Sequence, residues 1–208
     1  MLQAVTTDAV RSILRAIRRA WLPIVSVGVV YILGVVVGLV MVHTGNTFAL
    51  AQRDALVARA HASDPASLAL QYGDRLQAAL IDVANNLLLG AVPSTIGGLA
   101  IVIPFPVALY HGWVGGIVSV DSAHASRLAH PAAATYYLIT LVLQLIPYAL
   151  AGGAGVQLGV AYLRPRPSYT GKRWFRFPVE ALREVGRIYV LVVPLFLIAS
   201  LYEFLFVP

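Results

Sequence analysis

The feature that most constrains this chain is an uninterrupted apolar run of 22 residues, Trp21–Val42, that contains no charged side chain. As an α-helix, this run is long enough to cross the ~30 Å hydrocarbon core of a bilayer. It is also longer than the ~7–15 apolar residues of a signal peptide. We therefore expect a retained membrane-spanning helix here rather than a cleaved leader.

The composition extends this expectation to the whole chain. Apolar residues make up 59% and charged residues 12% of the 208 residues, against about 45–50% and about 25% in soluble proteins. This balance excludes a disordered chain and a coiled coil. It predicts an all-α, polytopic transmembrane helix bundle, a single membrane domain over residues 1–208 in the cell membrane. Cysteine is absent, which excludes a disulfide framework and a cysteine-bound metal.

The basic residues are concentrated in two clusters that border apolar runs. Eleven of the fifteen Lys and Arg residues belong to them: Arg11, Arg15, Arg18 and Arg19 in the first, and Arg164, Arg166, Lys172, Arg173, Arg176, Arg183 and Arg187 in the second. Such clusters indicate membrane topology and lipid contact rather than nucleic-acid binding. Both should lie in the cytoplasm. The chain then makes five spans, with a cytoplasmic N-terminus and an external C-terminus, or shows six segments if one helix is broken.

Three segments are expected outside the hydrocarbon core. Residues 1–20 form an interfacial amphipathic helix, because apolar side chains recur at helical spacing over Thr7–Trp21 with arginines on the other faces. Residues 43–75 are extracytoplasmic, with a short helix over Phe48–Ala62 and a second from Pro65. Residues 164–187 are a cytoplasmic basic segment in which an interfacial helix starts near Pro178.

The later apolar runs are less regular than the first. The run 76–102 contains Pro93 and Gly97-Gly98, which predict a kink or break. The run 106–120 is short enough to be re-entrant or tilted. The run 132–163 is too long for one span and too short for two, so Pro147 and the glycines at 152–155 predict one broken helix. The last span covers 188–206.

Polar side chains occur inside these runs and mark the candidate functional residues. Asp82, Asn85 and Asn86 are spaced i, i+3, i+4 and should share a face that turns away from lipid. Asp82, His111 and Glu203 are the ionisable groups expected within the membrane, with Gln144 as a possible hydrogen-bonding partner. These groups either hold the bundle together or line a polar path.

No sequence motif predicts catalysis. The histidines lack the spacing of a metal site, and neither a phosphate-binding loop nor a nucleophile elbow is present. We therefore expect no enzyme activity, no cofactor and no bound metal. An intramembrane enzyme built on Asp82, His111 and Glu203 is one functional hypothesis, and it is weaker than the two that are described at the end of this section.

Glycine pairs predict close helix packing. Gly34 and Gly38 in the first span and Gly112 and Gly116 in the third form small-xxx-small pairs, which allow another helix to approach closely. Gly155 lies in the glycine run of the fourth. We expect these residues to be packing positions rather than ligand contacts.

Four segments resemble the stage II sporulation protein M family. Ala84-Asn85-Asn86-Leu87 resembles its paired-asparagine motif, and His111–Gly116 has the glycine spacing of its next motif, with histidine in place of asparagine. The segment Gln144–Gly159 is similar to a helix in which the family has a glutamate at the position of Gln144. Ile198–Phe204 looks like its terminal helix, which ends in a glutamate, here Glu203. The resemblance covers residues 75–208 and, more loosely, the first span.

The resemblance implies an integral membrane protein that assembles membrane or cell-envelope partners as a scaffold. It also implies a fold similar to the permease domains of type-2 ABC transporters. Two functional hypotheses therefore rank above the enzyme hypothesis. The first is a scaffold, and the second is a permease-like subunit that works with a separate ATPase. The expected partners are membrane lipid, a second copy or other membrane proteins, and that ATPase, but not nucleic acid.

Overall fold

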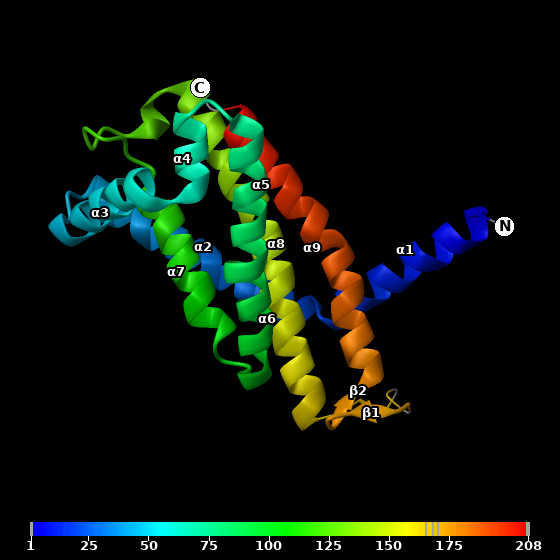
Figure 1. Ribbon diagram of the computed structural model, residues 1–208. Helices are drawn as coiled ribbons and strands as arrows, with labels where there is room; N and C mark the ends of the chain where they lie inside the picture. Colours follow the sequence, from blue (N-terminus) through cyan, green and yellow to red (C-terminus); the bar gives the residue numbers. More distant parts are fainter. Residues whose placement is uncertain (1, 165, 168, 170, 207–208) are drawn as a thin grey trace.

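The computed structural model describes residues 2–164, 166–167, 169 and 171–206, with side chains from residue 8 onward. Positions 165, 168 and 170 of the expected basic segment lie outside the described residues. Within these ranges the chain is helical apart from short loops and one hairpin (Figure 1). The α-helices are α1 (Leu2–Arg19), α2 (Trp21–His43), α3 (Thr47–Ser63), α4 (Pro65–Gln71), α5 (Arg75–Asn85), α6 (Val92–Gly97), α7 (Pro104–Ile117), α8 (Pro131–Leu163) and α9 (Val179–Leu205).

Four segments of the described chain are long and apolar enough to cross a membrane. They are α2, the continuous run Arg75–Ala100 that contains α5 and α6, α8, and α9. An all-α membrane helix bundle is therefore confirmed. The run expected over 106–120 is the 14-residue helix α7, which is shorter than the other four.

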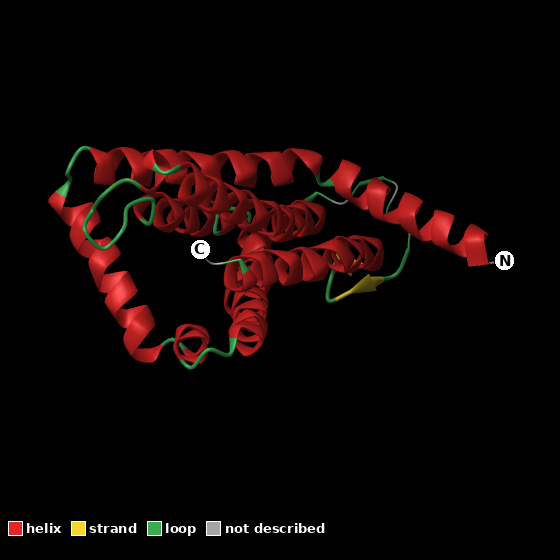
Figure 2. Cartoon of the chain, turned by 90° about the horizontal axis from the view of Figure 1, so that it is seen from above, coloured by secondary structure: helices red, strands yellow, loops and turns green. Residues whose placement is uncertain are grey.

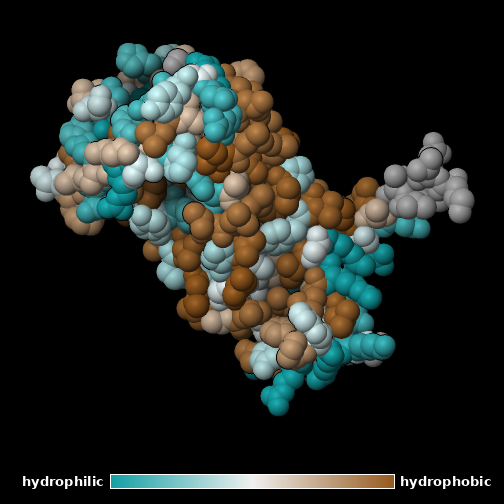
Figure 3. Space-filling model, viewed as in Figure 1, coloured by the Kyte–Doolittle hydropathy of each residue, from teal (hydrophilic) through white to brown (hydrophobic). Residues whose placement is uncertain are grey.

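The helices of the bundle run between its two ends, in alternating directions. In Figure 1, α2, α7 and α9 run toward the end that carries α3 and α4, and Arg75–Ala100 and α8 run back toward the end that carries α1 and the hairpin. Hydrophilic surface gathers at these two ends, and a mostly hydrophobic surface lies between them (Figure 3). This distribution is the one that a bilayer requires, because the lipid-facing side chains must be apolar.

Glycines bring α2 and α7 into direct contact. A Cβ atom at Gly34 or Gly38 would meet the backbone of α7, and one at Gly112 or Gly116 would meet the backbone of α2. The two small-xxx-small pairs therefore face each other within one chain. Backbone contact of this kind is the usual consequence of such pairs in membranes.

The run Arg75–Ala100 changes its hydrogen-bonding pattern three times. After α5 it continues as a π-helix, Asn86–Ala91, then as α6, and ends in a 3₁₀ turn, Gly98–Ala100. Pro93 follows the π-helix and has no N–H to donate to the preceding turn. The expected interruption is confirmed, although the segment remains one continuous helical run.

The interruption expected in the fourth apolar run is wrong. The fourth apolar run is a single helix, α8, that continues through Pro147 and Gly152–Gly155. Its glycines are packing positions: a Cβ at Gly153 would meet Ile24 of α2, and one at Gly155 would meet Thr95 of α6. The expected start of a helix near Pro178 is confirmed, because α9 begins at Val179. This helix continues without a break through the last apolar run, so the two segments form one helix.

One end of the bundle contains the capped helix α4, and the other contains a short β-hairpin. At one end, Asp64 caps α4 by accepting a 2.8 Å hydrogen bond from the Ser67 amide, as its position before Pro65 predicts. Figure 2 shows α3 extending away from the bundle before α4 returns the chain to α5. At the other end, β1 (Arg173–Trp174) pairs with β2 (Phe177–Pro178) as a short antiparallel hairpin.

The helix α1 extends from the bundle beside this hairpin (Figure 1). It spans Leu2–Arg19, close to the helix expected over residues 1–20. Its last residue, Arg19, forms an ion pair with Glu184 of α9. Val10 and Leu14 are exposed on this helix, as the apolar positions of an amphipathic helix without a protein partner would be.

Candidate functional site

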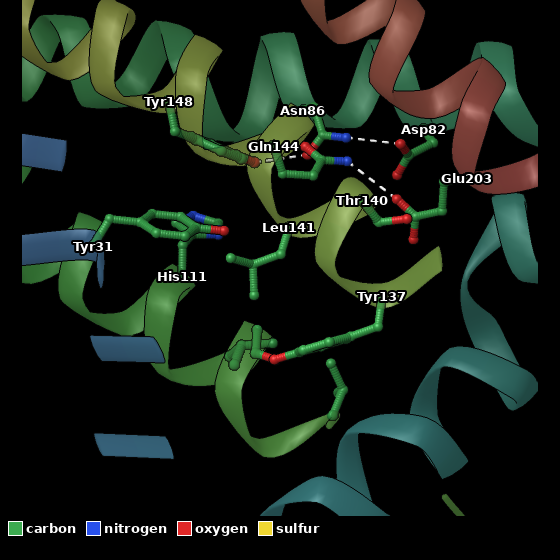
Figure 4. A pocket seen from close by; sticks show the side chains of 13 residues that line it. Tyr31, Asp82, Asn86, His111, Tyr137, Thr140, Leu141, Gln144, Tyr148 and Glu203 are labelled. Carbon is green, nitrogen blue, oxygen red and sulfur yellow. Dashed lines mark hydrogen bonds between the residues drawn. The ribbon is translucent and has the colours of Figure 1, made fainter. Parts of the chain in front are cut away.

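A partly open cavity of about 280 Å³, lined by both polar and apolar side chains, lies between the helices of the bundle. Helices α2, α5, α7, α8 and α9 contribute to its walls, together with the first residue of the π-helix. Figure 4 shows polar side chains from several of these helices pointing toward one another. The residues that line the cavity are Tyr31, Asp82, Asn86, His111, Val114, Gly115, Val118, Tyr137, Thr140, Leu141, Gln144, Tyr148 and Glu203.

Helix α8 supplies the largest share of this lining. Five of its residues face the cavity at helical spacing, i, i+3, i+4, i+7 and i+11: Tyr137, Thr140, Leu141, Gln144 and Tyr148. Residues at this spacing form one stripe on a helix. Because α8 is unbroken at Pro147, the stripe stays continuous along the cavity.

Asp82 is held in a chain of hydrogen bonds. The Tyr148 hydroxyl donates to Asn86 Oδ1 at 2.6 Å, and Asn86 Nδ2 donates to Asp82 Oδ2 at 2.8 Å (Figure 4). The Ser200 hydroxyl of α9 donates to the same carboxylate oxygen at 2.6 Å. The chain of bonds therefore ties α8, the π-helix, α5 and α9 together through one carboxylate.

Glu203 also lines the cavity and has fewer hydrogen-bond partners than Asp82. Gln144 Nε2 donates to Glu203 Oε2 at 3.1 Å (Figure 4). The Tyr136 hydroxyl donates to the backbone oxygen of Glu203 at 2.6 Å, which fixes the end of α9 against α8. Glu203 Oε1 accepts no hydrogen bond from the described residues.

Aromatic rings form the opposite wall. His111 stacks on Tyr148 with 4.6 Å between ring centroids, and Tyr31 stacks on Tyr148 at 6.4 Å. The Tyr137 hydroxyl donates to the Gly115 backbone oxygen at 2.8 Å. The Tyr31 hydroxyl, in contrast, points into the cavity and has no hydrogen-bond partner within the described part of the chain, although the residue is only 4% exposed.

The lining is rich in hydrogen-bond acceptors and poor in positive charge. Among the described residues, no Lys or Arg lines the cavity, which contains two carboxyl groups and one imidazole. Thr140 Oγ1 and Gln144 Oε1 are buried and have no hydrogen-bond partner in the part of the chain that the structure describes. The described residues contain no group of three or more His, Asp or Glu side chains placed to hold a metal ion. The cavity is therefore suited to a ligand that donates hydrogen bonds.

Most of the polar residues singled out in the sequence meet at this cavity. Asp82, Asn86, His111, Gln144 and Glu203 all line it. Asn85 does not: it lies in a groove against α3 and the start of α4. Of the singled-out glycines, Gly112 and Gly116 contact α2, and Gly155 contacts α6.

Sequence analysis missed the tyrosines of the site. Tyr31, Tyr137 and Tyr148 are each less than 10% exposed and line the cavity. Their signal was present in α8, where Tyr137, Gln144 and Tyr148 lie on one helical stripe.

Comparisons with known proteins agree with the motif resemblance. No curated protein and no solved structure gives a significant match to the chain. A family model described as stage II sporulation protein M matches residues 27–208. This range contains every residue that lines the cavity. The chain therefore belongs to the stage II sporulation protein M family.

Proposed function

We propose that this chain binds a small polar solute within the membrane and acts as a permease-like subunit, with a separate ATPase supplying the energy. The observation that supports this most strongly is the polar cavity in a bundle whose outer surface is apolar. Ionisable residues inside a membrane are costly, and they commonly mark a substrate or ion pathway. Buried polar groups are usually hydrogen-bonded, and in this cavity Thr140 Oγ1 and Gln144 Oε1 have no partner among the described residues.

The proposal requires that a solute can reach the cavity from water. Because the chain has no cysteine, single cysteines can be introduced without a background signal. Leu141→Cys places a thiol on the cavity wall, and Leu138→Cys places one on the exposed outer face of the same helix. In liposomes, a water-soluble thiol reagent should modify position 141 and leave the lipid-facing position 138 unmodified. Equal lack of reaction at both positions would remove the proposal.

We further propose five membrane crossings, with the N-terminus in the cytoplasm and the C-terminus outside. In this arrangement α7 is the fifth crossing and packs along α2. Val102→Cys, before α7, and Ala123→Cys, after it, occupy exposed loops. An impermeant thiol reagent should label position 123 from outside intact cells, and positions 102 and 172 (Lys172→Cys) only after lysis. Labelling of 102 and 123 from the same side would exclude the fifth crossing.

A scaffold function is the second candidate, and the position of α3 favours it. This helix extends from the bundle (Figure 2), and Phe48 and Tyr72 at the same end are strongly exposed. A partner in the cell envelope would therefore meet α3 and α4 first. A photo-crosslinking residue at Tyr72 should capture a partner in cells, whereas the same residue at the lipid-facing Val36 should not. Equal protein crosslinking at the two positions, or none at Tyr72, would remove the scaffold role.

A further inference from the structure

We infer that the solute taken by the cavity is a small aliphatic ammonium ion. This inference rests on the proposed function, because it names the class of solute that would enter the same cavity. Three features of the cavity support the inference: the charge of its lining, the polar atoms that have no partner among the described residues, and its aromatic walls.

The charge of the lining favours a cation. Asp82 and Glu203 face one cavity, and no Lys or Arg within the described residues lines it. The donors to these carboxyl groups are neutral: Asn86 and Ser200 for Asp82, and Gln144 for Glu203. Two acidic groups in a low-dielectric site repel each other and are costly without a positive partner. A bound cation supplies that charge, whereas an anion would add to the repulsion.

The unpartnered polar atoms favour a cation that carries N–H groups. Glu203 Oε1, Thr140 Oγ1 and Gln144 Oε1 have no partner within the described ranges. The Tyr31 hydroxyl points into the same space, is buried to 4% exposure, and is likewise without a partner among the described residues. The amide oxygen of Gln144 and a carboxylate oxygen of Glu203 can only accept hydrogen bonds, and the two hydroxyls can accept as well as donate. An ammonium group has up to three N–H donors of the kind a lysine carries, so it can satisfy these acceptors.

The aromatic walls and the size of the site argue against a bare metal ion. Tyr31, Tyr137 and Tyr148 line the cavity, and a largely apolar and aromatic lining with a few polar groups is typical of sites for organic ligands. A metal ion needs several oxygen ligands within about 2.0–2.6 Å of one point, and no cluster of acidic or histidine side chains among the described residues meets this need. A cavity of about 280 Å³ instead has the size of the smallest organic-ligand pockets, about 300 Å³.

The test compares three probes with the same four-carbon chain: 1,4-diaminobutane, which is doubly protonated at neutral pH, neutral butane-1,4-diol, and the dianion succinate. The full chain in lipid nanodiscs is titrated by calorimetry, and protection of Leu141→Cys from a neutral thiol reagent is measured in parallel. We expect the diamine to bind and protect, and the diol and succinate to do neither. Glu203→Gln keeps the shape and removes the charge, so it should weaken diamine binding by roughly tenfold or more.

A matched control is present on the same helix. Glu180→Gln makes the same chemical change in the first turn of α9, outside the cavity, and should leave diamine binding unchanged. Asp82→Asn is a second charge-removing variant, should Glu203→Gln fail to fold. Binding of the diol or succinate as strongly as the diamine would overturn the ammonium inference while leaving the proposed solute site intact. An inert thiol at position 141, with no binding of any probe, would overturn both.

Discussion

At the scale of single residues, Tyr148 joins the aromatic wall of the cavity to its hydrogen-bonded side. Its hydroxyl donates to Asn86 Oδ1 at 2.6 Å, and its ring stacks on His111 at 4.6 Å. On the side of α9, Phe196 meets the ring edge-to-face at 5.0 Å. Removing the hydroxyl alone therefore separates the polar contribution of Tyr148 from its packing.

Tyr148→Phe should lower the free energy of unfolding by about 0.6–2 kcal/mol, the range found for hydrogen bonds between membrane helices. The physical reason is that Asn86 Oδ1 loses its donor while the ring contacts remain. Reversible unfolding in mixed micelles measures the change. Tyr110→Phe, at an exposed position on α7, is the control and should have little effect. An equal loss in both variants would contradict the role assigned to the hydroxyl.

Gly116→Ala tests the contact between α2 and α7. A Cβ at this position would meet the backbone oxygen of Val35, and backbone cannot yield as a flexible side chain does. We expect destabilisation of about 1–3 kcal/mol, the usual cost of overpacking. Gly186→Ala in α9 is the matched control, because a Cβ there meets nothing within 4 Å. It should be neutral or stabilising by up to about 1 kcal/mol, as measured by the same unfolding assay.

Residue spacing predicted part of the site but not its boundary. Asp82, Asn85 and Asn86 were expected on one face, yet only Asp82 and Asn86 reach the cavity. Asn85 and Asn86 are about 100° apart on a helix, so both cannot point to the centre of one site. Choosing between them requires the positions of α3 and α4, against which Asn85 lies. Spacing within one segment carries no information about these neighbours.

At the scale of elements, α1 is attached to α9 by one polar cluster. Arg19 pairs with Glu184, and the Tyr169 hydroxyl donates to Glu184 Oε2 at 2.7 Å. Arg166 completes the cluster by donating to the Arg19 backbone oxygen at 2.9 Å. Hydrogen bonding to Glu184 raises the pKa of Arg19 above its ordinary value.

Glu184→Gln should release this attachment. The loss of a hydrogen bond to a charged group costs about 1.5–3 kcal/mol, and we expect the low end because the Arg19 side chain is 37% exposed. Limited proteolysis should then cut more readily within α1, while unfolding of the bundle changes little more than this amount. Glu180→Gln, one turn earlier in α9, is the control. Unchanged proteolysis of α1 would show that the cluster does not hold the helix.

A second polar contact joins α3 to the loop after α7. Asp54 accepts hydrogen bonds from Arg53 at 2.9 Å and from His124 at 2.9 Å. The bond from Arg53, followed by that from His124, lowers the pKa of Asp54 below its ordinary value. A carboxylate with a lowered pKa contributes its full stabilisation above the ordinary pKa of about 3.9, and loses it as the pH falls through the lowered value.

We therefore expect the loop 121–127 to loosen in acid. Amide hydrogen exchange, corrected for its intrinsic pH dependence, should rise in this loop relative to α7 as the pH falls below about 4. Asp54→Asn should show the faster exchange already at neutral pH and a weaker dependence on acid. An identical pH response in the variant would mean that another group controls the loop.

The sequence predicted elements that depend on local signals and failed on those that depend on packing. The start of α4 was predicted correctly from Asp64-Pro65, because a cap involves only neighbouring residues. The continuity of α8 through Pro147 was not predicted, because it depends on packing: Gly153 contacts α2 and Gly155 contacts α6. A glycine run predicts a break when viewed alone and a helix contact when its partners are known.

At the scale of the whole molecule, the two ends differ in charge and in exposed aromatic residues. The hairpin end carries the basic clusters, and Trp174 and Phe175 at its tip are 62% and 78% exposed. The other end has the near-neutral segment 43–75, with three Arg and three Asp. Basic residues beside exposed aromatic rings are typical of a surface that lies at an anionic leaflet, so lipid composition should affect one end of the molecule and not the other.

Arg173→Glu should therefore reduce the preference of the chain for anionic lipid, whereas Arg59→Glu should not. Both arginines are exposed, so neither change disturbs the core, but Arg173 lies in β1 and Arg59 in α3 at the opposite end. The measurement is the difference in thermal stability between nanodiscs of anionic and of zwitterionic phospholipid. A basic residue near an anionic surface contributes about 1 kcal/mol, and reversing its charge turns that attraction into repulsion. Equal shifts for the two variants would mean that the charge asymmetry of the molecule does not set its contact with lipid, and the orientation proposed for the five crossings would lose its electrostatic basis.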